Sequence, residues 1–373
     1  MPVYLPLSAE LPVQRLAAVF AQVTNSYKFY WFLAMLERAQ NDRGRLMPVD
    51  ELLAEMVALA WYPANMFRLS LGKQDQLNDI PLRLREARGL APHERPAVVR
   101  RATLEEMHDG RSAVGGQIRN LGVYVPRRFL APFFEAELRG RKDTEKNRLI
   151  ERLADEAFAD GERPCLYRFV ADAGRLAIEF HPGWYGYFRA HAHILKDFCL
   201  WNLLLYVQKN NPNVPNLAAK LFEPGVRDLS RARRYWDAAL EALGPRPCVY
   251  SGTLVGRGAY SLDHFLPWSY VAHDLLWNIV PTTTNINSAK GDRVPELGRY
   301  FGDFARLQYE ALQVTATAAR ARLVEDYTLL FKVSSLEELR AVARGRFEAT
   351  LYDTISPQVQ IAENLGFVTG WRY

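Results

Sequence analysis

The sequence predicts a mainly α-helical protein with one small α+β unit embedded in it. Helical periodicity covers most of the chain, and a short irregular stretch, residues 245–295, differs from its surroundings. The 373 residues are 49% hydrophobic and 24% charged, which is ordinary for a globular protein and excludes disordered and collagen-like chains. This length allows two or three domains with sizeable cores.

The elements are expected in the following order. Helical patterns occupy residues 27–38, 50–62, 184–209, 227–243 and, with interruptions, about 295–347. A β-hairpin is expected near residues 165–180, where two segments flank Asp172-Ala173-Gly174. The chain therefore divides into a mostly helical region (1–244), the irregular unit (245–295) and a C-terminal helical region (296–373).

The irregular unit contains two short predicted strands followed by a short helix. Residues 248–254 and 260–266 are the strands, around Gly256-Arg257-Gly258. Thr284 can cap the start of the helix, and Gly291 can end it.

Four polar residues in this unit, Asp263, His264, Asn287 and Lys290, have side chains that can bind a cation or transfer a proton. Asp263 and His264 are adjacent at a strand end, so their side chains leave on opposite faces. Asn287 and Lys290 are three residues apart on the predicted helix and share a face. Carboxylate and amide oxygens suit Mg²⁺ or Mn²⁺, whereas Zn²⁺ prefers cysteine and histidine.

This set resembles the HNH nucleases, the ββα-metal superfamily, over about residues 245–295. Asp263-His264 is followed after 14 residues by Asn278, after 9 more by Asn287 and after 3 more by Lys290. The spacing is close to that of the HNH domain of RNA-guided CRISPR nucleases. The amino-acid sequences of residues 263–268, 277–281 and 287–290 also look like those of HNH proteins of bacterial phage-defence systems.

The resemblance implies a role for each of these five residues. His264 would be the general base that takes a proton from the attacking water. Asp263 and Asn287 would hold one Mg²⁺ or Mn²⁺. Asn278 would hold the loop that orients His264, and Lys290 would contact phosphate near the metal. Many HNH enzymes have histidine at the position of Asn287, and asparagine keeps an oxygen ligand there.

No structural zinc ion is predicted. Many HNH domains hold zinc with two Cys-x-x-Cys pairs, but here Cys248 begins no such pair and no second pair follows His264. A unit of about 50 residues without metal or disulfide staples has too small a core to be stable alone. We therefore expect the helices on both sides to pack against it.

The sequence thus predicts a metal-dependent DNA endonuclease or nickase that acts in phage defence or restriction. One alternative is a nucleic-acid-binding or scaffold subunit of a defence complex, and another is an HNH enzyme that acts on RNA. Residues 1–244 would recognise DNA or regulate the nuclease. The chain has no P-loop, so energy-driven DNA handling would require a separate ATPase or another defence subunit.

Charge and cysteine content set the expected surroundings. The net charge of +5 permits a nucleic-acid partner without requiring one. Arginine clusters stand at residues 83–88, 100–101, 127–128, 139–142 and 231–234, and at least one should line the approach to His264. With three distant cysteines, no signal peptide and no long apolar run, the expected location is the cytoplasm, without a membrane partner.

Overall fold

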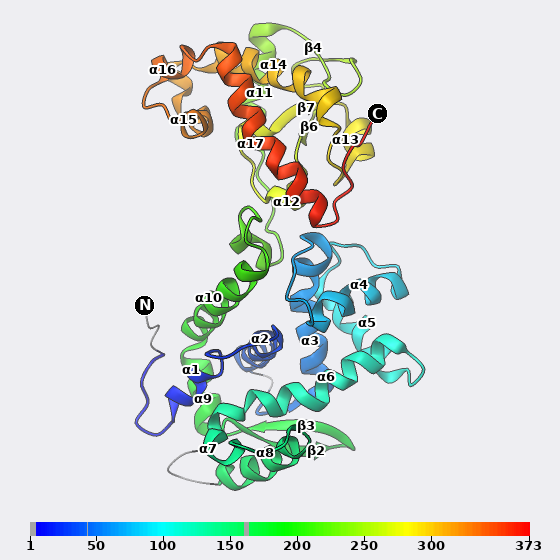
Figure 1. Cartoon of the computed structure of the whole chain (residues 1–373), viewed down its shortest axis with the longest axis vertical. Helices are drawn as coiled ribbons and strands as arrows, with labels where there is room; N and C mark the ends of the chain where they lie inside the picture. The colour runs from blue at the N-terminus through cyan, green and yellow to red at the C-terminus, as the bar shows by residue number, and fades with distance from the viewer. Residues whose placement is uncertain (1–4, 43, 160–163) are drawn as a thin grey trace. The chain divides into compact units, whose positions relative to one another are not determined.

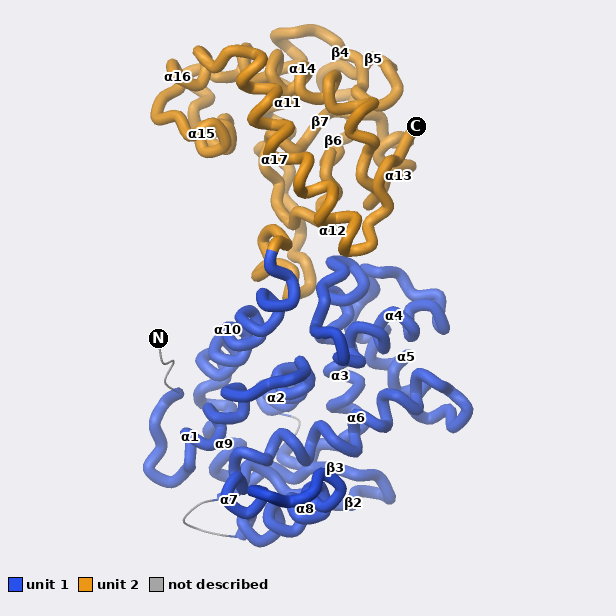
Figure 2. Tube along the Cα trace, viewed as in Figure 1, with its two compact units in different colours: residues 1–212 blue, residues 213–373 orange. Residues whose placement is uncertain are grey.

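The computed structural model describes residues 5–42, 44–159 and 164–373, and the chain divides into two compact units (Figures 1 and 2). Unit 1 comprises residues 1–212 and unit 2 residues 213–373. The division lies before the sequence-based boundary at 244–245. The reason is that helix α11 (Ser230–Leu243) packs against α14 (Leu297–Thr315) and strand β7 (Ile279–Thr282) of unit 2.

Unit 1 is helical apart from one three-stranded antiparallel sheet in the order β1-β3-β2. Its helices are α1 (Val13–Ala18), α2 (Tyr27–Gln40), α3 (Val49–Trp61), η1 (Tyr62–Met66), α4 (Gln76–Arg88), α5 (Pro96–His108), α6 (Ala113–Phe129), η2 (Ala131–Phe134), α7 (Glu135–Leu138), α8 (Asp143–Phe158), α9 (Pro182–Ala190) and α10 (Ala192–Asn210), and its strands are β1 (Leu46–Pro48), β2 (Tyr167–Asp172) and β3 (Arg175–Phe180).

Two expectations for unit 1 can be compared directly with these elements. The predicted hairpin is confirmed, because β2 and β3 pair antiparallel around Ala173 and Gly174. The helix predicted over residues 184–209 is instead two helices, α9 and α10. They are separated at His191, whose φ of −116° and ψ of 20° are not helical. The sequence pattern did not reveal this break because no proline or glycine stands at it: residues 189–193 are Arg-Ala-His-Ala-His.

Unit 2 contains the irregular stretch and the helices that surround it. Its elements are η3 (Leu217–Leu221), α11, β4 (Arg246–Pro247), β5 (Leu254–Val255), β6 (Ser261–His264), α12 (Trp268–Val271), η4 (Leu276–Asn278), β7, α13 (Thr284–Lys290), α14, η5 (Ala318–Leu323), α15 (Glu325–Phe331), α16 (Leu336–Arg340) and α17 (Arg344–Asn364). No helix in the described ranges has the length and apolar character that crossing a bilayer requires.

Strand pairing in unit 2 differs from the expected arrangement around Gly256-Arg257-Gly258. β4 pairs with β5, and β6 pairs with β7, so that Asp263 lies opposite Val280 and His264 opposite Ile279. A single bridge between Gly256 and Ala259 is all that remains near the glycines. The partner of β6 is thus the apolar segment that follows Asn278, which the local sequence pattern did not mark as a strand.

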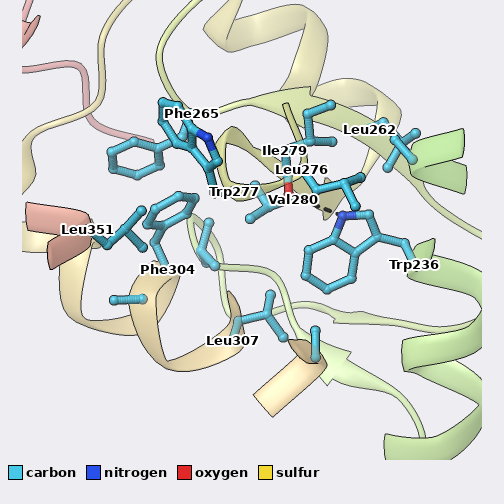
Figure 3. Close-up of a cluster of buried hydrophobic side chains, with 14 of the residues drawn as sticks. Trp236, Leu262, Phe265, Leu276, Trp277, Ile279, Val280, Phe304, Leu307 and Leu351 are labelled. Atoms are coloured by element: carbon cyan, nitrogen blue, oxygen red, sulfur yellow. Dashed lines mark hydrogen bonds between the residues drawn. The ribbon is translucent and has the colours of Figure 1, made fainter. Parts of the chain in front are cut away.

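The helices on both sides of the irregular stretch supply its core. One buried cluster extends from α11 through β5, β6 and β7 to α14, α17 and Trp371. Figure 3 shows Phe265 stacked on Phe304 of α14, with ring centroids 4.1 Å apart. It also shows Trp236 of α11, whose Nε1 donates to the Ile279 carbonyl at 3.1 Å. The small sheet therefore has no hydrophobic core of its own.

This shared core predicts how fragments of the chain behave. A peptide of residues 245–295 is expected to be unfolded, because burying its apolar side chains requires α11, α14 and α17. A fragment of residues 213–373 is expected to fold. Circular dichroism and the dispersion of amide NMR signals distinguish the two states, and a folded 245–295 peptide would contradict the prediction.

Candidate active site

The site is formed where α13 crosses β6. The Thr283 hydroxyl accepts from the Ile286 amide at 3.4 Å, so Thr283, rather than the predicted Thr284, is the N-cap of α13. Gly291 ends the helix with a φ of 55°, a conformation that favours glycine. Asn287 and Lys290 lie on the same face of α13, and this face packs against the strand that carries Asp263 and His264.

Asp263 is a buried carboxylate with two strong partners. It is 3% exposed. Its Oδ1 accepts from Lys290 Nζ at 3.1 Å, and its Oδ2 accepts from the Tyr250 hydroxyl at 2.6 Å. Burial, and then the charge of Asp263, raise the pKa of Tyr250 well above its ordinary value, so the phenol remains a donor. Each carboxylate oxygen accepts only one hydrogen bond here and keeps a second lone pair.

Lys290 is buried at the centre of this arrangement. Its side chain has no exposed area, and Nζ also donates to the His264 carbonyl at 2.6 Å. These contacts make Lys290 a positioning residue for both Asp263 and the backbone of His264. The phosphate contact that the resemblance implies for Lys290 stays a prediction.

Asn287 directs one amide atom to the protein and the other to solvent. Its Nδ2 donates to the Ser261 hydroxyl at 2.9 Å and to the Leu262 carbonyl at 3.1 Å. Its Oδ1 accepts no hydrogen bond from a described residue and is not among the buried unpartnered atoms, so it is open to solvent. Oδ1 is therefore the atom available to bind a cation.

Asn278 acts as a clamp on the chain that leaves β6. Its Oδ1 accepts from the Leu266 amide at 2.8 Å, its Nδ2 donates to the Leu266 carbonyl at 2.9 Å, and its own carbonyl accepts from the Phe265 amide at 2.8 Å. The side chain is fully buried. These contacts hold the backbone at Phe265 and Leu266, and the loop-holding role that the resemblance implies for Asn278 stays a prediction.

His264 contacts a different set of residues from Asp263, as expected from strand alternation. Its Nε2 lies 2.7 Å from Asp274 Oδ1. Its Nδ1 makes no hydrogen bond to a described residue and is not one of the buried unpartnered atoms, so it too is open to solvent. The imidazole thus has one nitrogen held by Asp274 and one without a hydrogen bond to a described residue.

Sequence reasoning missed two residues of the site, Tyr250 and Asp274. Asp274 lies in the loop between the first two parts of the motif, at a position that the motif does not include. Tyr250 stands two residues after Cys248, before the motif begins at Asp263. Neither carries a local signal, since both reach the site through the folding of β5, β6 and β7.

The comparison with protein families agrees with this geometry. Residues 248–296 match the family described as HNH endonuclease. This segment is an HNH domain. The domain indicates nuclease activity and is a small α+β unit within helical surroundings. Comparisons with curated proteins and with solved structures give no match.

The donors of the HNH domain fit a hard divalent cation. In the part of the chain that the structure describes, no three His, Cys, Asp or Glu side chains gather into a metal site. The candidate ligands are instead the Asp263 carboxylate and the solvent-open Oδ1 of Asn287. Both are oxygen donors, which suits Mg²⁺ or Mn²⁺.

One of the predicted arginine clusters, residues 231–234, belongs to the same unit as the HNH domain. Arg231 bonds to Asp326 at 2.7 Å, and Arg233 lies over the ring of Tyr260 at 4.9 Å. Asp326 in turn accepts from the Leu276 amide at 2.9 Å, beside the clamp residue Asn278. These two arginines therefore contact the HNH domain and its neighbouring helices from the surface of unit 2.

His273, in the loop beside His264, is expected to make the stability of the fold sensitive to acid. Burial, and then the charge of His264, lower the pKa of His273 to about 4. Between about pH 6.5 and 4 the unfolded chain therefore binds more protons than the folded chain. The free energy of unfolding decreases as the pH falls through that window. His273→Asn, which keeps an acceptor for the Leu275 amide, removes the titrating group.

Thermal melting at pH 7.5 and pH 4.5 checks this effect. The loss of stability on acidification should be smaller in His273→Asn than in the wild type, by on the order of 1–3 kcal/mol. An equal loss in both proteins would contradict the assigned burial of His273.

Proposed function

We propose that this protein is a divalent-metal-dependent DNA endonuclease that nicks one strand at its HNH domain. The observation that carries the proposal is the placement of three groups at one crossing of strand and helix. These are the Asp263 carboxylate, the solvent-open Oδ1 of Asn287 and the solvent-open Nδ1 of His264. A carboxylate, a neutral oxygen ligand and an imidazole base are the groups that metal-assisted phosphodiester hydrolysis requires.

The roles of the residues follow from their surroundings. Asp263 and Asn287 would hold one Mg²⁺ or Mn²⁺, which when bound supplies positive charge to the scissile phosphate and the leaving oxygen. His264 takes a proton from the attacking water. Lys290 and Tyr250 orient the Asp263 carboxylate, and Asn278 holds the segment that follows His264. A single domain of this kind cuts one strand, so a monomer nicks.

A groove on the same unit supports DNA as the substrate. A cavity of about 290 Å³ is lined by residues of β4, the β4–β5 turn and α14, including Arg246, Arg299 and Arg306. Tyr250, which donates to Asp263, lines the same cavity. Arg246 pairs with Glu310 and Arg306 with Asp303, whereas Arg299 makes no ion pair within the described residues. Arg299 is the guanidinium best placed to bind a DNA phosphate.

We further propose phage defence or restriction as the biological setting. Support comes from the resemblance of the segments around Asp263, Trp277 and Asn287 to HNH proteins of phage-defence systems. A separate ATPase or another defence subunit would then provide energy-driven steps, and unit 1 would recognise DNA or regulate cleavage.

The nuclease proposal predicts metal-dependent nicking that depends on His264. Purified protein should convert supercoiled plasmid to the open-circular form with Mg²⁺ or Mn²⁺ but not with EDTA. His264→Ala should lose at least about 10²-fold in rate while still binding DNA in a gel-shift assay, because the base is lost and the phosphate contacts remain. Asn287→Ala should require more metal, because one ligand is removed.

Several outcomes would contradict this assignment. Cleavage by His264→Ala at the wild-type rate would contradict the role of His264 as the general base. DNA binding without cleavage in the presence of any metal would favour the scaffold alternative. Preference for an RNA duplex over DNA would favour the RNA alternative. Equal phage plating on bacteria that express wild type or His264→Ala would contradict the defence setting.

The groove makes a separate prediction about salt dependence. Arg299→Ala should reduce the slope of log affinity against log salt by about 1 for duplex DNA, because one phosphate contact is lost. Arg346→Ala is the matched control, since Arg346 is exposed on α17 of the same unit and does not line the groove. Equal slopes for both variants would exclude Arg299 from the DNA interface.

A further inference from the structure

Asp274 is the residue outside the HNH motif that touches the base. It lies in the loop between α12 and η4, ten residues after His264, and its Oδ1 is 2.7 Å from His264 Nε2. The His264 side chain is 7% exposed and that of Asp274 is 29% exposed. The hydrogen bond is therefore largely shielded from water on the histidine side.

The chemistry of this contact determines which nitrogen of His264 carries hydrogen. An ionised carboxylate can only accept a hydrogen bond, and a neutral imidazole has one N–H and one lone pair. Nε2 must therefore donate to Asp274, which leaves the lone pair on Nδ1, the nitrogen that is open to solvent. We propose that Asp274 is a positioning residue that holds His264 in this tautomer, so that Nδ1 is the atom that accepts the proton of the attacking water.

The proposal rests on the nuclease function and specifies its proton transfer. The water proton moves to the lone pair of Nδ1 while the water oxygen forms a bond to phosphorus. The bond between phosphorus and the leaving oxygen breaks, and its electron pair stays on that oxygen. The resulting imidazolium is stabilised by the Asp274 carboxylate at Nε2, as in other histidine–carboxylate pairs that perform base catalysis.

The loop that carries Asp274 is held from several sides. The Leu276 amide donates to Asp326 Oδ2 at 2.9 Å, and the Leu275 amide donates to His273 Nδ1 at 3.4 Å. The Lys220 ammonium is buried and donates to the Tyr270 carbonyl, just before the loop. None of these three contacts involves His264. The position of the Asp274 carboxylate is therefore held independently of His264, as a positioning role requires.

Asp274→Asn tests the proposal because asparagine is close in size but presents an N–H as well as an oxygen. The amide N–H can donate to Nε2 and so favour the other tautomer. We expect the rate of plasmid nicking to fall by about 10²- to 10⁴-fold with DNA binding unchanged. Asp353→Asn, an exposed position on α17, is the matched control and should cleave like the wild type.

A measurement on the metal-free protein separates this proposal from the nuclease function itself. Histidine ¹⁵N–¹H correlation spectra at pH 8, with His264→Ala used to assign the signals, should show His264 protonated at Nε2 in the wild type. The same pattern should persist in Asp274→Glu, which keeps a carboxylate acceptor, and should be lost in Asp274→Asn. This measurement does not require cleavage. Failure to nick DNA would therefore contradict the nuclease proposal, whereas the spectra alone decide the tautomer assignment.

The outcomes are distinguished as follows. Retention of the Nε2–H tautomer in a folded Asp274→Asn protein, or wild-type nicking by that variant, would overturn the proposal. In the His264→Ala background, adding Asp274→Asn should not lower residual cleavage further, because Asp274 acts through His264. An undiminished effect of Asp274→Asn in that background would also overturn it.

Discussion

The buried ion pair between Lys290 and Asp263 is the contact on which the arrangement of the HNH domain depends. Asp263 is almost completely removed from solvent, and an uncompensated carboxylate there would cost several kcal/mol. Lys290 supplies the compensating charge from α13 and also donates to the His264 carbonyl, so the same ammonium ties the helix to the strand. Asn287 lies one turn earlier on that face and contacts β6 through the hydrogen bonds that its amide donates to Ser261 and Leu262. Removing either member of the pair would leave a buried charge, which typically costs about 3–5 kcal/mol.

The helices of unit 2 supply the hydrophobic core of the HNH domain. Two separate two-stranded sheets, one of two-residue strands and one of four-residue strands, bury little apolar area by themselves. Here Phe265, Ile279 and Val280 are buried against α11 and α14, and Gln308 of α14 donates to the carbonyls of Leu276 and Ile279. The site is thus held by the two long helices that flank it in the sequence, α11 and α14.

Strand alternation separates the tasks of two adjacent residues. Asp263 is directed toward Tyr250 and Lys290, and His264 toward Asp274. A carboxylate that would hold a cation and an imidazole that would accept a proton are therefore placed one residue apart without competing for the same partners. The solvent-open atoms, Oδ1 of Asn287 and Nδ1 of His264, are the ones that the internal hydrogen bonds leave unused.

The sequence by itself determined the helical character of the chain, the hairpin of β2 and β3, and the residue types of the HNH motif. These features are local: helical periodicity, turn residues and fixed spacings such as that from Asn287 to Lys290 are encoded within a few residues. The tertiary structure alone decided that β6 pairs with β7, that α11 belongs to unit 2, and that Tyr250 and Asp274 touch Asp263 and His264. Those contacts depend on strand register and on helix packing across the core, and a pattern of neighbouring residues carries no information about either.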